Sequence, residues 1–223
     1  KVHLAGLLLS FVLAGLTAIV LVNFNTSDFF IGERTFLPAF FYVLLTGFLS
    51  GMQHLNPVLP ASFLLLLAVI RINGSYRVEG VAYNFFDAGL LIGTGSLFYA
   101  NLAWFVVLLI IGLAIYRSFN IIEIIISIIG VIVPWALTFG YYYLSGKSLK
   151  DLIVSAGQGL FGESQAAGYG TIELIILITA GAVVLLSIAY LFMDMGKMKI
   201  KSRKTFYLLA WVFVMTAIIF MIV

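Results

Sequence analysis

The chain contains no cysteine and only two histidines, His3 and His54. Without cysteine it forms no disulfide, no thiolate metal site, no iron–sulfur cluster and no cysteine nucleophile. Two histidines are also too few for a histidine-rich metal or haem site. We therefore expect no metal and no cofactor.

Charged side chains are scarce as well, at 9% of the 223 residues, whereas 63% of the residues are hydrophobic. A soluble domain carries about 25% charged residues, so most of the surface of this chain must face hydrocarbon. The composition predicts an all-α fold, a polytopic transmembrane helical bundle that forms one integral-membrane domain over residues 1–223. Five of the twelve basic residues lie in one short loop, which favours membrane lipids over nucleic acid as partners.

Eight apolar stretches approach the length of about 20 residues that a helix needs to cross a bilayer. They are His3–Val22, Phe36–Met52, Val58–Ile72, Phe85–Tyr99, Asn101–Tyr116, Ile121–Leu144, Thr171–Met193 and Thr205–Val223. The first and the last three are the most secure, and Pro38 interrupts the second near its start. The third and fourth are short. We expect about eight membrane helices, two of them short or discontinuous.

The distribution of basic residues predicts the orientation in the membrane. If all eight stretches cross, one side holds Arg34, Arg71, Arg77, Arg117, Lys197, Lys199, Lys201, Arg203 and Lys204. The positive-inside rule places that side in the cytoplasm of a bacterial inner membrane. The predicted cytoplasmic loops are Asn23–Thr35, Asn73–Asn84, Arg117–Asn120 and Asp194–Lys204. Lys1 is then external, and with the apolar end at Val223 this predicts a domain that is truncated or unresolved at both ends.

Two connections have a predicted role at the membrane surface. Within the long outer connection Gly146–Gly170, apolar residues are spaced to form one face of a short surface helix, namely Leu149, Leu152, Ile153 and Leu160. The basic run before the last helix is expected to contact anionic lipid headgroups, at roughly 1 kcal/mol per residue. Its members are Lys197, Lys199, Lys201, Arg203 and Lys204.

The segment Asn84–Gly89 opens the short fourth stretch and carries Asp87. Two interpretations are open. Asp87 caps free helix N–H groups, or it faces a polar cavity and pairs with Arg71 or Arg77. Gly89 and Gly93 form a small-xxx-small step, which is typical of close helix packing.

A second polar segment, Gln53–Pro57, is predicted on the outer side and contains His54 and Asn56. A histidine beside an amide could form a proton relay or a sugar-binding group. The alternative is a turn, in which Asn56 precedes Pro57 and Pro60 occupies the first turn of the next helix.

Several short motifs together resemble a known family. They are Thr35–Ala39, Asn56–Pro57, Leu59–Ala61, Asn84–Gly89, Ser96–Tyr99 and Lys199–Lys204. The set resembles an uncharacterised, domain-of-unknown-function family of bacterial multi-pass inner-membrane proteins, of which this chain looks like an internal portion. The resemblance implies a further upstream helix and more membrane sequence after Val223. Some members carry a carotenoid-oxygenase label, which this chain does not support because that chemistry needs more histidine ligands than it has.

The sequence contains no catalytic triad, metal cluster or phosphate-binding loop. We therefore expect a non-enzymatic subunit or scaffold of a cell-envelope assembly, with membrane lipids and other membrane proteins as partners. One alternative is an integral-membrane glycosyltransferase or polymerase that handles lipid-linked sugars. Its substrate would need a polar external cavity that contains His54 or residues of the Gly146–Gly170 connection. A second alternative is a small-solute transporter, in which Asp87 would reach a cavity at mid-membrane.

Overall fold

The computed structural model describes residues 2–28, 35–48, 56–76, 82–116, 121–161, 171–194, 196 and 199–222. Within these ranges it is 92% helical and has no strand, which confirms the all-α fold. The helices are α1 (Val2–Asp28), α2 (Leu37–Phe48), α3 (Val58–Asn73), α4 (Ala82–Phe98), the 3-10 helix η2 (Ala100–Phe105), α5 (Val106–Tyr116), α6 (Ile121–Leu144), α7 (Leu149–Phe161), α8 (Thr171–Asp194) and α9 (Ile200–Ile222).

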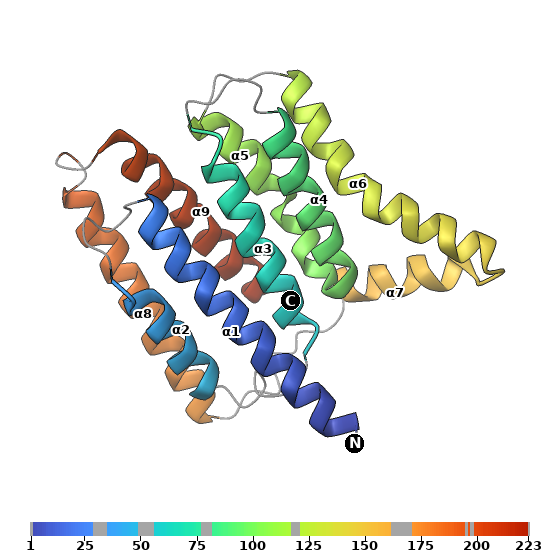
Figure 1. Ribbon diagram of the computed structural model, residues 1–223, viewed down its shortest axis with the longest axis horizontal. Helices are drawn as coiled ribbons and strands as arrows, with labels where there is room; N and C mark the ends of the chain where they lie inside the picture. Colours follow the sequence, from blue (N-terminus) through green and yellow to red (C-terminus); the bar gives the residue numbers. More distant parts are fainter. Residues whose placement is uncertain are drawn as a thin grey trace.

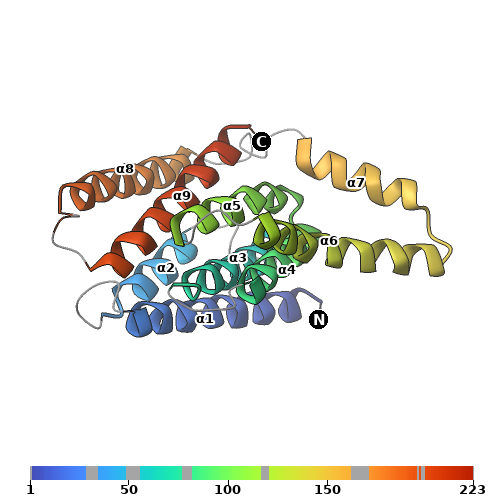
Figure 2. The same cartoon turned by 90° about the horizontal axis from the view of Figure 1, so that it is seen from above.

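The helices form one antiparallel arrangement (Figure 1). In that view α1, α3, α5 and α8 run toward the upper left, and α2, α4, α6 and α9 run toward the lower right. Seen from above, α3 and α4 lie between α1 on one side and α5 and α9 on the other (Figure 2). Helices that follow one another along the chain therefore alternate in direction, apart from the short α7.

In the part of the chain that the structure describes, four helices have the length and hydropathy to cross a membrane, over Gly6–Thr26, Ile121–Leu144, Ile175–Met193 and Ile200–Phe220. They correspond to the first and the last three predicted spans. The other four stretches form shorter helices. With a rise of 1.5 Å per residue, the 12 residues of α2 cover about 18 Å, well below a hydrocarbon core of about 30 Å. The structure thus supports four of the predicted eight spans by length and composition.

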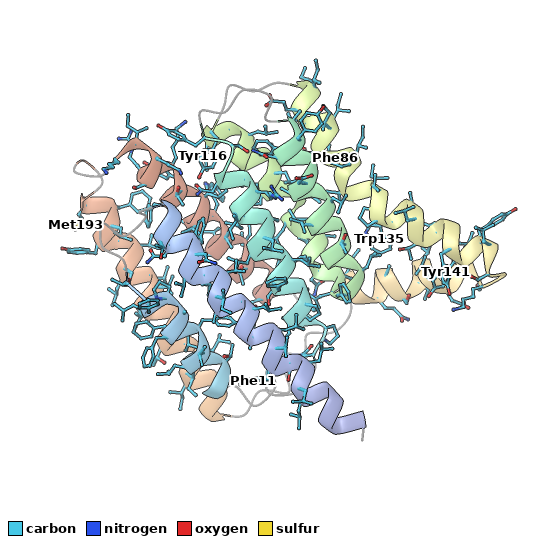
Figure 3. All side chains as sticks on the ribbon, in the orientation of Figure 1. Phe11, Phe86, Tyr116, Trp135, Tyr141 and Met193 are labelled. Carbon is cyan, nitrogen blue, oxygen red and sulfur yellow. The ribbon has the colours of Figure 1, made fainter. Side chains whose placement is uncertain are left out.

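The buried core lies at the centre of the bundle, where α3, α4, α5 and α9 meet. Its fully buried apolar side chains include Ile72, Phe85, Ile92, Leu113 and Leu208. Other large apolar side chains point outward, as Figure 3 shows for Phe11 and Met193, which are 79% and 88% exposed. An apolar exterior around a small apolar core is the pattern expected of a chain whose solvent is lipid.

Small residues bring α4 and α6 into backbone contact. A side chain on Gly89 would collide with the carbonyl oxygen of Ser127, and one on Gly130 would collide with that of Phe86. One turn along, Gly93 lies against the backbone of Val131. This confirms that the Gly89–Gly93 step serves close helix packing, which dispersion forces favour in a membrane.

Several predicted boundaries differ from the observed ones. The fourth stretch begins at Ala82 rather than Phe85, and the fifth divides into η2 and α5. The last helix begins at Ile200, so Lys201, Arg203 and Lys204 belong to its first turns rather than to a preceding loop. Pro38 is the second residue of α2, where a proline is tolerated, and it does not interrupt the helix.

A helix is confirmed within Gly146–Gly170, namely α7, while its place on the outer membrane surface stays a prediction. Ser148 begins it, because its hydroxyl accepts a hydrogen bond from the amide of Asp151 (3.3 Å). Before it, α6 carries Pro134 in its interior and changes direction along its length (Figure 1). The far end of α6 and α7 together enclose one side of a pocket.

Candidate binding pocket

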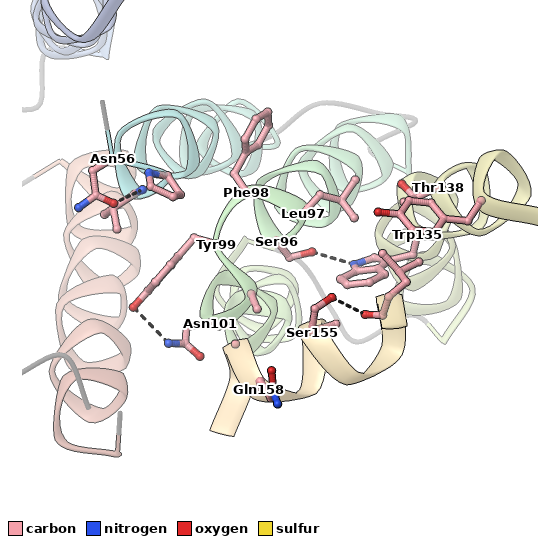
Figure 4. Close-up of a pocket in the computed structure, with 17 residues that line it drawn as sticks. Asn56, Ser96, Leu97, Phe98, Tyr99, Asn101, Trp135, Thr138, Ser155 and Gln158 are labelled. Atoms are coloured by element: carbon pink, nitrogen blue, oxygen red, sulfur yellow. Dashed lines mark hydrogen bonds between the residues drawn. The ribbon is translucent and has the colours of Figure 1, made fainter. Parts of the chain in front are cut away.

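A pocket of about 510 Å³ lies at the end of the bundle where α3 begins and α4 ends (Figure 4). Its walls come from the start of α3, the end of α4, η2, the second half of α6, and α7. Ligand pockets are commonly about 300–1,000 Å³, so its size suits a small molecule or a headgroup.

The turn between α4 and η2 places an amide in the pocket wall. Tyr99 leaves the helix with φ −137° and ψ 103°, and Asn101 follows in the 3-10 turn. The Asn101 amide nitrogen donates a hydrogen bond to the Tyr99 hydroxyl (3.1 Å). Its Oδ1 atom is buried and accepts no hydrogen bond from the described residues. Asn101 as a whole is 2% exposed, so the pocket wall contains a buried acceptor that lacks a donor.

The indole of Trp135 is fixed by a hydrogen bond between α6 and α4. Its Nε1–H donates to Oγ of Ser96 (2.8 Å), and the Ser96 hydroxyl donates to the carbonyl of Gly93 (2.7 Å). These two hydrogen bonds can form in series because the contact at Gly89 and Gly130 brings α4 and α6 close together. Tyr142, two turns later on α6, also lines the pocket.

Asn56 forms the edge of the pocket where α3 begins. Its Oδ1 accepts a hydrogen bond from the amide of Val58 (3.2 Å), and its carbonyl accepts one from Leu59 (3.0 Å). Pro60 lies in the first turn of α3. The predicted turn is therefore confirmed. His54 lies outside the described residues.

The residues of α7 close the pocket opposite η2. Leu152, Ser155, Ala156, Gln158 and Gly159 line it. A Cβ atom on Gly159 would lie 2.9 Å from that of Ala100, so the two elements approach closely there. Part of the Gly146–Gly170 connection thus contributes to a cavity, as the glycosyltransferase alternative requires.

None of the described residues that line the pocket is charged. The lining offers amides, hydroxyls and aromatic rings, which can bind a neutral polar molecule but supply no carboxylate or imidazole for proton transfer. Across the described residues, no three His, Asp or Glu side chains lie close enough to hold a metal ion.

The predicted polar site around Asp87 lies elsewhere on α4. Because α4 begins at Ala82, Asp87 is the sixth helical residue, and the capping interpretation is wrong. Its Oδ2 atom lies 3.8 Å from Nε of Arg71, with side chains 44% and 57% exposed. The pairing with Arg71 is therefore observed, but neither residue lines the pocket. Asn84 is half-buried on the same helix, and Arg77 lies outside the described residues.

The side chains of the basic run Lys197–Lys204 differ in their exposure and in their contacts. Lys199 and Arg203 are exposed and Lys201 is half-buried, while Lys197 lies outside the described residues. The Lys204 ammonium lies over the rings of Tyr76 and Tyr116, 5.7 Å and 6.0 Å from their centroids. Lys204 therefore contacts two aromatic rings at the ends of α3 and α5.

A buried polar cluster joins α3, α5 and α9 beneath Lys204. Oδ1 of Asn73 accepts hydrogen bonds from the hydroxyls of Tyr116 (2.8 Å) and Thr205 (2.6 Å). All three residues are at most 5% exposed. Sequence reasoning missed this cluster. It also missed Ser96, Asn101 and Trp135 as residues that line the pocket. The available signal was that Asn73, Tyr116 and Thr205 all lie near helix ends on the same predicted side.

No protein-family model, curated protein or solved structure matches this chain.

Proposed function

We propose that the chain is a non-enzymatic subunit or scaffold of a cell-envelope assembly, held in a bacterial inner membrane as a multi-pass protein. The observation that carries this proposal is that the apolar helix α8 is not buried by the rest of the chain. Its apolar span Ile175–Met193 has a mean hydropathy of 2.6, and none of that span is buried. A helix with so little packing against its own chain needs cover from lipid or from another protein.

The composition of α8 favours a protein partner. Ala180, Gly181 and Ala182 form a run of small residues at the middle of the helix, and nothing lies within 4 Å of a Cβ atom placed on Gly181. An outward-facing glycine such as Gly181 allows a second membrane helix to approach closely, as Gly89 does within this chain. We therefore assign this stretch of α8 to contact with a membrane helix of a partner subunit.

The described lining of the pocket is consistent with a role that does not involve catalysis, because none of its described residues supplies the carboxylate or imidazole that glycosyl transfer requires. The proposed topology has all eight apolar stretches in the membrane. The shorter ones are accommodated by local thinning and by contact with their neighbours. The alternating helix directions (Figure 1) suit that topology, and the positive-inside rule places the start of α9 in the cytoplasm.

The test combines native purification with cross-linking from α8. A photoreactive residue replaces Leu186, which is 71% exposed, and the matched control replaces Phe11 of α1, which is 79% exposed. We expect Leu186 to cross-link to one co-purifying protein in stoichiometric amount and Phe11 to cross-link to lipid. A protein that elutes alone from a gentle detergent, with only lipid cross-linked at Leu186, would overturn the proposal.

A second function, the handling of lipid-linked sugars by a glycosyltransferase or polymerase, is favoured by one observation. The pocket contains residues of α7, which lies at the end of the bundle proposed to be external. Turnover of a labelled lipid-linked sugar by the purified chain would establish it. The transporter alternative has no comparable support, because Asp87 does not line the pocket.

A further inference from the structure

We propose that the pocket between α4, η2, α6 and α7 binds a neutral, hydroxylated ring, the chemistry of a single sugar unit. This inference goes beyond the proposed function and does not depend on a partner subunit, since it concerns a different part of the fold. It rests on three properties of the pocket lining: a buried acceptor without a donor, several aromatic side chains, and the absence of charge among its described residues.

The first property is the unsatisfied acceptor on Asn101. A buried oxygen that accepts no hydrogen bond is costly, because it has lost its contact with water. Figure 4 shows the Asn101 amide with its nitrogen toward Tyr99 and its oxygen turned toward the side of α7. If the amide were rotated by 180°, its NH₂ group would take the place of the oxygen and would also require a partner. The oxygen has almost no exposed area in the ligand-free structure, so a ligand reaches it once the Asn101 side chain or the facing turn of α7 shifts. A hydroxyl suits either orientation of the amide, because it both donates and accepts.

The second property is the aromatic surface beside that amide. Trp135 and Tyr142 line the same pocket, and the indole N–H is already used by Ser96 (2.8 Å). Trp135 therefore has no donor left for a ligand and offers its ring instead. Aromatic rings provide large apolar contact at little cost in conformational entropy, which suits the apolar faces of a sugar ring.

The third property concerns charge. The polar side chains that line the pocket carry amides, hydroxyls and one indole N–H. They are Asn56, Ser96, Tyr99, Asn101, Trp135, Thr138, Tyr142, Ser155 and Gln158. A phosphate or carboxylate ligand would be expected to require a positively charged side chain, and none is present among the described lining residues. The ligand is therefore uncharged at the part that enters the pocket.

A sugar ring could reach this end of the bundle in two ways. It could arrive as a soluble saccharide, or as the headgroup of a glycolipid whose tails remain in the bilayer beside α7. The two sources share the same recognition chemistry. They differ in whether binding occurs from solution.

The test uses the full chain, purified without glucoside or maltoside detergents and reconstituted in phosphatidylcholine nanodiscs. One arm measures equilibrium binding of radiolabelled methyl glucoside. The other arm uses nanodiscs that contain a neutral monoglucosyl lipid and measures its retention by the protein. Saturable binding in the first arm identifies a soluble saccharide, and retention in the second arm alone identifies a glycolipid headgroup. Either result supports the inference.

Two variants report on the pocket itself. Ala156→Trp places a large side chain in the pocket from α7, and Ile153→Trp places the same side chain on α7 at a residue that is 58% exposed and does not line the pocket. We expect at least a tenfold loss of affinity in the first variant and no change in the second. Asn101→Leu is expected to lose about tenfold as well, since one hydrogen bond is removed. No saturable binding in either arm, or unchanged binding by Ala156→Trp, would overturn the inference.

Discussion

Gly89 of α4 lies directly against the backbone carbonyl of Ser127 of α6, and no side chain fits between them. The contact brings the two helices close enough for Ser96 and Trp135 to form a hydrogen bond nearer the end of α4. The geometry of the pocket therefore depends on a residue that does not line it.

Gly89→Ala should destabilise the protein, because the added methyl group must displace the α6 backbone. Overpacking of this kind costs about 1–3 kcal/mol. Thermal unfolding in detergent micelles measures the effect as a lower melting temperature. Gly15→Ala on α1 is the matched control, since nothing lies within 4 Å of its added Cβ atom. Equal melting temperatures for the two variants would contradict the close α4–α6 contact.

Tyr116→Phe should weaken the junction of α3, α5 and α9, because it removes the donor to Asn73 (2.8 Å). The expected cost is about 1 kcal/mol. Asn73→Leu should cost more, because it removes the shared acceptor of two buried hydroxyls and leaves only the longer bonds from Tyr116 to Thr205 (3.4 Å) and from Thr205 to the Lys201 carbonyl (3.1 Å). Chemical denaturation of the two single variants and of the double variant measures the coupling. Tyr141→Phe serves as the control, since Tyr141 is 61% exposed. Independent, additive effects would exclude the shared network.

Asp87→Asn should leave the fold intact, because Asp87 does not cap α4 and its ion pair with Arg71 is long and partly exposed (3.8 Å). Exposed pairs of this kind contribute about 0–1 kcal/mol. The yield of folded protein and its melting temperature should stay close to those of the unaltered chain. A loss as large as that of Gly89→Ala would show that Asp87 has a structural role which the observed geometry does not provide.

Long-range packing explains where sequence reasoning succeeded and where it did not. The four longest helices could be predicted because about 20 consecutive apolar residues leave few alternatives, and the glycine step of α4 indicated its close contact. The start of α4 is not predicted correctly, because Ala82–Asn84 has little hydropathy and the apolar run begins only at Phe85. The pocket could not be predicted, because Asn56, Asn101 and Trp135 lie far apart in the sequence and meet only after folding.

The proposed topology has the chain crossing the membrane with its pocket at the outer face and the start of α9 in the cytoplasm. Because the chain has no cysteine, each single-cysteine variant carries one thiol. Lys150→Cys tests α7, where Lys150 is exposed, and Ser202→Cys tests the first turn of α9. In intact cells, a membrane-impermeant maleimide should label Lys150→Cys and should label Ser202→Cys only after permeabilisation. Labelling of Ser202→Cys in intact cells, with protection of Lys150→Cys, would show the opposite orientation.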